Sequence, residues 1–268
     1  MIALREKGRQ LLESGVVNVA IGYAEGSSSA RRRPVFIRRP EDADQLVFDD
    51  RCRQVLAVYL LKPEVLALGK PAIVARPTTL RAILQLAMEN QLRDGAVLAL
   101  AVADESTVLE LSTFGAIEEH LARQSRVSAG DGCDELSAIG DLSLNDRAAF
   151  WRKEFDRCIK CYACRAACPL CYCSRCITDC NKPQWVSVAS DPFGNLEWNV
   201  VRAMHLAGRC VGCGSCADAC PQNIRIDLLN RLLAREASAQ FGAEPGYSLR
   251  REYALAAFKP DDKEEFIR

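Results

Sequence analysis

One stretch of this chain decides its fold: Cys158-Ile159-Lys160-Cys161-Tyr162-Ala163-Cys164-Arg165-Ala166-Ala167-Cys168-Pro169. The same spacing, Cys-x2-Cys-x2-Cys-x3-Cys-Pro, returns between Cys210 and Pro221, so the two runs form an internal repeat. Thiolates at this spacing wrap one corner of a [4Fe-4S] cube, and each terminal proline stops the turn because it has no N–H to continue it. The repeat therefore predicts a dicluster ferredoxin-like domain of the α+β class.

The two runs also predict which cysteines share a cluster. In paired runs of this kind, the fourth cysteine of each run ligates the other cluster. The ligands expected for the first [4Fe-4S] cluster are Cys158, Cys161, Cys164 and Cys220, and those for the second are Cys210, Cys213, Cys216 and Cys168. Zinc is the alternative metal, since Cys-x2-Cys pairs also occur in zinc knuckles, but two complete runs with terminal prolines favour clusters.

Four further cysteines directly follow the first run and could complete another metal site. They are Cys171, Cys173, Cys176 and Cys180. A third [4Fe-4S] cluster, a zinc ion and unliganded thiols all remain open for this group, because its spacing is uneven. No catalytic residue is predicted, since neither histidine belongs to a nucleophile or zinc constellation.

Basic residues stand next to the expected ligands. Arg157, Lys160, Arg165 and Arg209 would raise the reduction potential of a negatively charged cluster, or they are ordinary surface charges. Two tryptophans between the runs, Trp185 and Trp198, are expected to shield the clusters from water.

The first 124 residues alternate strand-like and helix-like patterns, which predicts an α/β domain. Strands are expected at 16–22, 34–37, 72–75 and 96–102, and a helix at 79–90 with Thr79 as its cap. A Ser-, Gly- and Asp-rich linker is expected at 125–144. The dicluster domain is expected at 145–240, with Asn145 as the cap of its first helix. A tail at 241–268 is expected to dock on a partner or to fray.

Composition excludes some functions. Lys plus Arg and Asp plus Glu number 35 each, so nothing favours a nucleic-acid or other polyanionic partner. The longest apolar run, 96–103, is far shorter than a membrane span, and the first residues lack a signal-peptide core. Cysteines at metal-ligand spacing fit a reducing compartment, so a cytoplasmic protein is expected.

A loop with three consecutive arginines, Arg31 to Arg33, follows the first expected strand. It could bind a phosphate-bearing cofactor or an acidic partner, although a solvated loop is the favoured explanation. No Gly-x-Gly-x-x-Gly fingerprint accompanies it, so FAD is not supported by a motif.

Residues beyond the cysteines carry a resemblance to a known family. Four segments are similar to the β subunits of deazaflavin-coenzyme-reducing hydrogenases and formate dehydrogenases. They are 150–165, 168–173, 202–210 and Leu56-Ala57-Val58-Tyr59-Leu60-Leu61-Lys62-Pro63. Relatives of this kind carry a cysteine where this chain has Arg76 to Arg81, and another near Ala103. The resemblance thus implies that Cys52 and Cys133 are remnants of a degenerate N-terminal metal site.

The resemblance implies an iron–sulfur electron-transfer subunit of a cytoplasmic redox complex in anaerobic metabolism. Its expected partners are a heterodisulfide-reductase-like flavoprotein and a catalytic subunit of the formate dehydrogenase or hydrogenase type. Two alternatives remain: an FAD-containing reductase subunit that acts on a soluble electron carrier, and a structural or assembly subunit stabilised by metal.

Overall fold

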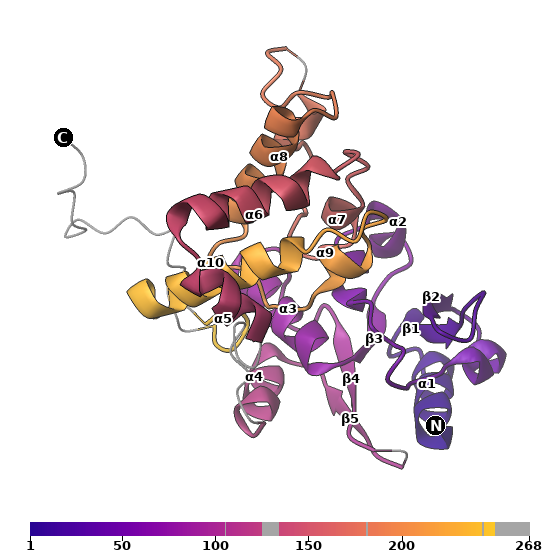
Figure 1. The fold of residues 1–268 in the computed structure, drawn as a ribbon. Helices are drawn as coiled ribbons and strands as arrows, with labels where there is room; N and C mark the ends of the chain where they lie inside the picture. The colour runs from indigo at the N-terminus through magenta and orange to yellow at the C-terminus, as the bar shows by residue number, and fades with distance from the viewer. Residues whose placement is uncertain (105, 125–133, 181, 243, 250–268) are drawn as a thin grey trace.

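The computed structural model describes residues 1–104, 106–124, 134–180, 182–242 and 244–249 (Figure 1). A five-stranded sheet has the order β2-β1-β3-β4-β5. Its strands are β1 (Val19–Glu25), β2 (Arg32–Ile37), β3 (Pro71–Ala75), β4 (Leu98–Val102) and β5 (Val108–Leu111). The three central strands are parallel and both edge strands are antiparallel to their neighbours, so the chain has the mixed α/β content that the sequence predicts.

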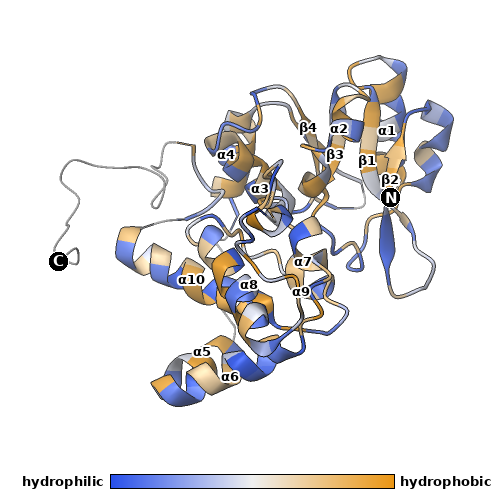
Figure 2. Cartoon of the chain, turned by 90° about the horizontal axis from the view of Figure 1, so that it is seen from above, coloured by the Kyte–Doolittle hydropathy of each residue, from blue (hydrophilic) through white to orange (hydrophobic). Residues whose placement is uncertain are grey.

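The central strands form because they are continuously apolar. Residues 19–24 of β1 and 72–75 of β3 are all buried, as parallel strands covered on both faces usually are. Figure 2 shows β3 and β4 coloured as hydrophobic. Helix α3 (Pro77–Met88) connects these two strands and presents eight buried residues, which fixes it against the sheet.

The remaining elements are mostly helical, and the later ones surround the cysteine runs. They are α1 (Ile2–Glu13), η1 (Pro40–Gln45), η2 (Leu56–Tyr59), α2 (Pro63–Leu66), α4 (Phe114–Ala122), α5 (Asp134–Asp141), α6 (Leu144–Asp156), α7 (Ala163–Ala166), η3 (Ile177–Asp179), α8 (Pro192–His205), α9 (Ser215–Asp218) and α10 (Ile226–Phe241). Among the described residues, none of the helices is both long and apolar enough to cross a membrane.

Several predicted boundaries were wrong for identifiable reasons. Strand β1 begins at Val19 and not at residue 16. The residues before it are still hydrogen-bonded to the last turn of α1, since the Val17 N–H donates to the Leu11 carbonyl. Helix α3 begins at Pro77, whose fixed φ suits a first helical position, so Thr79 lies inside the helix and does not cap it.

The first helix of the cysteine-rich half also starts differently from the prediction. Ser143, and not Asn145, caps α6, and its Oγ accepts the Asp146 N–H at 3.2 Å. Part of the predicted linker is ordered as well, since α5 lies within it and buries Leu136 and Ile139. Strand β5 and helix α4 were not predicted.

Two hydrophobic clusters organise the molecule. The larger one surrounds the sheet and extends into the cysteine-rich half through Leu170, Leu206 and Val211. The smaller one joins α5, α6 and α10. Its buried members are Leu136, Ile139, Trp151, Phe155, Cys216, Ile224, Ile226 and Leu228. The cysteine runs lie between these two clusters.

The segment that follows α10 returns to the α/β part of the molecule. The Pro245 carbonyl accepts a hydrogen bond from the buried Arg81 guanidinium, and the Tyr247 ring lies 4.3 Å from that guanidinium. Gly246 has a φ of +74° and approaches the Arg81 backbone so closely that a Cβ would lie 2.2 Å from its carbonyl oxygen. Residues 244–249 therefore dock on α3, and the rest of the predicted tail, 250–268, lies outside the described residues.

Candidate metal centres

The two cysteine runs have the same local conformation. Two residues in each run take the left-handed conformation, Lys160 (φ 50°) and Tyr162 (φ 57°) in the first, and Gly212 (φ 69°) and Gly214 (φ 74°) in the second. A helix of one turn follows each loop, α7 in the first run and α9 in the second. The sequence repeat is thus also a structural repeat, although only the second run has glycine where the backbone favours it.

Backbone amides donate to the cysteine sulfurs at equivalent places. The Lys160 N–H points to Cys158 Sγ and the Gly212 N–H to Cys210 Sγ, both at 3.4 Å. The buried Asn230 side chain approaches Cys216 with its Nδ2 3.6 Å from Sγ. N–H donors around a sulfur stabilise its negative form, so these loops suit thiolate ligands.

Two cavities bring the cysteines together in two groups of four. The first cavity is lined by Cys158, Cys161, Cys164 and Cys220, together with Tyr162, Trp198, Pro221 and neighbouring residues. The second is lined by Cys168, Cys210, Cys213 and Cys216, together with Gly212, Gly214, Arg202 and neighbouring residues. In each group, three cysteines come from one run and the fourth comes from the other.

Helix α8, between the two runs, holds the first cavity together. Asn195 Nδ2 donates to the Cys158 carbonyl at 2.8 Å, and Arg202 Nη2 donates to the Cys164 carbonyl at 2.9 Å. The Trp198 ring packs edge-on against Tyr162 with centroids 5.0 Å apart. Sequence reasoning did not single out the two polar residues, although Asn195, Trp198 and Arg202 recur at the spacing of one buried helix face.

The two tryptophans of the inter-run segment have different environments. Trp198 is 3% exposed and lines the first cavity, as expected of a residue that excludes water. Trp185 is 63% exposed, so the expectation that it shields a cluster was wrong. The preceding residues 182–184 are exposed as well, so the ring has no buried face to cover.

Burial works against thiolate formation in the second cavity unless positive charge compensates. Desolvation raises the pKa of Cys210 to about 11 and that of Cys216 to about 12, while Arg202 lowers both. Only the thiolate ligates a metal. Binding of a positively charged iron centre would supply the compensation that the buried thiols need.

The basic residues singled out beside the ligands are largely neutralised. Arg157 pairs with Glu154 at 2.6 Å, Arg165 pairs with Asp179 at 2.8 Å, and Arg209 pairs with Glu89. The Lys160 ammonium donates to the Ser187 carbonyl. These four side chains are thus engaged in holding loops and helices together.

The third group of cysteines is only partly drawn together. Cys171 and Cys173 line a further cavity, shared with Cys161 and Cys168 of the first run. The Cys168 and Cys171 thiols share a hydrogen bond, which raises the pKa of Cys168 and lowers that of Cys171 to about 6. Cys176 and Cys180 do not line that cavity; the Cys180 thiol instead lies 3.6 Å from the Cys176 carbonyl.

Other metal-type side chains do not converge. Within the parts of the chain that the structure describes, no three His, Cys, Asp or Glu side chains gather tightly around one point as for a single metal ion. Cys52 is fully buried and accepts the Asp49 N–H at 3.4 Å, while Cys133 lies outside the described residues.

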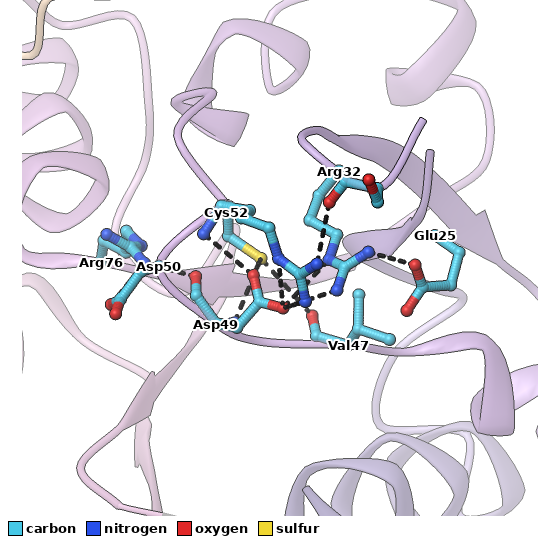
Figure 3. A network of polar contacts seen from close by, with 9 residues as sticks. Glu25, Arg32, Val47, Asp49, Asp50, Cys52 and Arg76 are labelled. Carbon is cyan, nitrogen blue, oxygen red and sulfur yellow. Dashed lines mark hydrogen bonds and ion pairs between the residues drawn. The ribbon is translucent and has the colours of Figure 1, made fainter. Parts of the chain in front are cut away.

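An arginine-lined cavity lies where the sheet approaches the helices of the cysteine runs. Its lining residues are Ala30, Arg31, Arg32, Arg51, Arg53, Gln54, Ala167, Ser215, Asp218 and Ala219. Figure 3 shows how a polar network fixes one side of it: Asp49 binds Arg32 at 2.7 Å, and its carbonyl accepts from Arg76 at 2.5 Å. The Ser215 hydroxyl is buried and has no hydrogen-bond partner among the described residues.

Comparison with known proteins agrees with this geometry. Residues 206–226, which include the second run, match a 4Fe-4S binding domain. The second cysteine run thus has the sequence of a 4Fe-4S binding domain. The chain is 34% identical over 96 residues to the F420-dependent formate dehydrogenase subunit beta of Methanocaldococcus jannaschii. It is 35% identical over 57 residues to the F420-dependent formate dehydrogenase 1 subunit beta of Methanococcus maripaludis.

These matches cover only part of each protein. The first spans 36% of this chain and 25% of the relative, and the second spans 21% and 14%. A putative oxidoreductase of Escherichia coli, YgfK, is 34% identical over 89 residues, which is 31% of this chain and 8% of that protein. The chain therefore spans a quarter or less of the relatives that it matches, and the predicted resemblance to formate dehydrogenase β subunits is confirmed over those segments.

Proposed function

We propose that this chain is an iron–sulfur electron-transfer subunit that carries two [4Fe-4S] clusters. The observation that carries the proposal is the grouping of eight cysteines in two cavities, each lined by three cysteines of one run and the fourth of the other. A [4Fe-4S] cluster accepts and releases single electrons, and two of them in one small domain provide a relay. The division into an α/β domain at 1–124 and a dicluster domain at 145–240 is part of this proposal.

Paired cysteine substitutions test the ligand sets. In anaerobically purified protein, C158S and C220S should each remove the electron paramagnetic resonance signal of one cluster, and C168S and C210S the signal of the other. C52A is the matched control, because its thiol is buried outside both cavities. If C168S and C158S damaged the same signal, the crossed assignment would be wrong, and zinc in place of iron would refute the electron-transfer role.

The metal content of the purified protein would show what the third cysteine group binds. We propose either a third [4Fe-4S] cluster or a zinc ion bound by Cys171, Cys173, Cys176 and Cys180. About twelve irons per chain would support a third cluster. About eight irons with one zinc would support the zinc site, and about eight irons without zinc would contradict both. C176S and C180S should lower the content of that metal only.

The partners are proposed from the relatives' names. A subunit named beta belongs to a complex, so we infer that this chain works beside a catalytic subunit of the formate dehydrogenase or hydrogenase type. On its other side it would exchange electrons with a flavin or Fe–S partner, such as a heterodisulfide-reductase-like flavoprotein. We place this complex in the cytoplasm. Anaerobic affinity purification from the native source tests this. Recovery of the chain with no redox subunit would contradict it.

The arginine-lined cavity favours a second candidate function, an FAD-containing reductase subunit. Arg32 and Arg51 pair with Asp49, and the other two arginines of the cavity, Arg31 and Arg53, would bind the phosphates of a flavin. The wall also includes Ala167 and Ser215, the neighbours of the proposed ligands Cys168 and Cys216. Flavin analysis of the purified protein tests this candidate. R31A and R53A should release bound flavin, whereas R38A, an exposed arginine outside the cavity, should not.

A further inference from the structure

Arg202 is the buried positive charge at the centre of the cysteine-rich region. It lies on α8 and is 3% exposed. One of its N–H groups donates to the Cys164 carbonyl, but its Nε and Nη1 atoms are buried and have no hydrogen-bond partner among the described residues. A buried guanidinium with two unsatisfied donor atoms is costly, so its site must be completed by an acceptor.

The neighbours of this guanidinium come from both proposed ligand sets. The cysteine side chains that act most strongly on the Arg202 guanidinium are those of Cys171, Cys164, Cys168 and Cys216. Cys164 belongs to the first set, whereas Cys168 and Cys216 belong to the second, and Arg202 lines the cavity of the second set. The side chain thus stands between the two sets.

No carboxylate competes for this charge among the described residues. The acidic residue in the same cavity wall, Asp227, is held by Arg225 at 3.0 Å. This distinguishes Arg202 from Arg157, Arg165 and Arg209, each of which pairs with a carboxylate. Its positive charge is therefore left to interact with sulfur.

We propose that Arg202 is a positioning residue shared by the two clusters: its free N–H groups donate to cluster or ligand sulfur on both sides, and its charge favours the reduced state of each. The inference rests on the proposed function, because it requires both [4Fe-4S] clusters. Adding an electron makes a cluster more negative, and a fixed, desolvated cation stabilises that form more strongly than an exposed one does.

The test compares wild type, R202M, R202K and the control R152M in the anaerobically purified, cluster-loaded chain. Arg152 is an exposed arginine of α6, so R152M removes the same charge from the surface. Iron and sulfide content establishes first that wild type holds both clusters. A wild type without iron would defeat the proposed function itself, and the question about Arg202 would fall with it.

Redox titration followed by electron paramagnetic resonance gives the decisive shift. In R202M the reduction equilibrium constant of both clusters should fall at least tenfold, or ~59 mV for one electron, while R152M leaves both midpoints in place. Unchanged midpoints in a cluster-loaded R202M would overturn the inference and leave the proposed function standing. A shift of one cluster alone would overturn the shared role.

A second measurement decides the matter if R202M does not retain its clusters. With 15N-labelled arginine, pulsed electron paramagnetic resonance of each reduced cluster should detect nitrogen coupling in wild type that is lost in R202K, which keeps the charge but not the planar fork of donors. Persistence of the full coupling at either cluster in R202K would overturn the inference.

Discussion

Asp49 is the residue that orders the polar network beside the arginine-lined cavity. Its carboxylate binds Arg51 at 2.6 Å and Arg32 at 2.7 Å, and the Arg32 side chain is only 4% exposed. These guanidinium groups hold the pKa of Asp49 well below its usual range. Asp49 did not stand out in the sequence, and Arg32 did so only as one of three consecutive arginines, because the contact between them joins residues that are distant along the chain.

Replacing Asp49 by Asn should destabilise the protein by about 2 kcal/mol at pH 7, because it removes a negative charge and leaves Glu25 as the carboxylate partner of the Arg32 side chain. The folded-state pKa of Asp49 is lowered, so its contribution to the stability of the protein is full above about pH 4 and is lost as the pH falls through the folded pKa. The midpoints of thermal unfolding of wild type and D49N should therefore differ by a constant amount above about pH 4 and converge at lower pH.

The exposed Asp44 provides the control for this prediction. It pairs with Arg9 at 3.0 Å and its side chain is 70% exposed, so D44N should change the midpoint by little at any pH. An equal effect of D44N and D49N would mean that the network contributes no more than an ordinary surface ion pair.

At the scale of the element, the two cysteine runs differ in backbone strain. The second run places Gly214 at a φ of +74°, and a Cβ added there would meet nothing within 4 Å. In the first run Tyr162 occupies the equivalent position at a φ of 57° and packs on Trp198. Packing thus offsets a conformation that costs a residue with a side chain about 1–2 kcal/mol.

Gly214→Ala should therefore lower the free energy of unfolding by about 1 kcal/mol through the backbone alone, since no steric contact is added. Gly115→Ala is the matched control: Gly115 lies in helix α4, where alanine is the better helix former, and its Cβ would meet only Thr113 Oγ1, at an ordinary contact distance of 4.0 Å. Chemical denaturation of the cluster-loaded protein measures both. A neutral G214A would show that the loop relaxes without cost.

At the scale of the whole molecule, one buried ion pair connects the sheet half to the second cysteine run. Glu89, just beyond α3, binds Arg209, the residue before Cys210, with Nε 2.8 Å from the carboxylate. The Tyr172 hydroxyl donates to the same carboxylate at 2.7 Å, and its ring lies 5.3 Å from the Arg209 guanidinium. The Glu89 side chain is 7% exposed, so this contact is shielded from solvent.

Glu89→Ala should cost about 3 kcal/mol, because it leaves the largely buried Arg209 charge without its carboxylate partner. The double variant E89M/R209M should recover much of that loss, since apolar pairs replace buried ion pairs at little cost. E119A is the control, because Glu119 pairs with Arg123 on the exposed face of α4. Thermal unfolding measures all of them, and a double variant less stable than E89A would argue against this account.

The sequence by itself determined the repeat of the cysteine runs, their cluster chemistry and the apolar strands of the sheet, because ligand spacing and hydrophobic patterning are local properties of the chain. It also predicts the crossed grouping of the eight cysteines, which the resonance spectra of the four serine variants test. The exact ends of β1, α3 and α6 escaped it, since caps and turn closures depend on neighbouring backbone atoms.

Only the tertiary structure decided which polar side chains enter the cysteine-rich region. Arg202 reads in the sequence as one more basic residue on a helix, yet burial and the absence of a carboxylate beside it give it a different role from Arg157 or Arg165. Likewise, two arginines of the cavity lie at the start of β2 and two in the segment 51–53, and they gather only when the sheet forms. Burial and charge pairing are long-range outcomes of folding, which local sequence patterns do not contain.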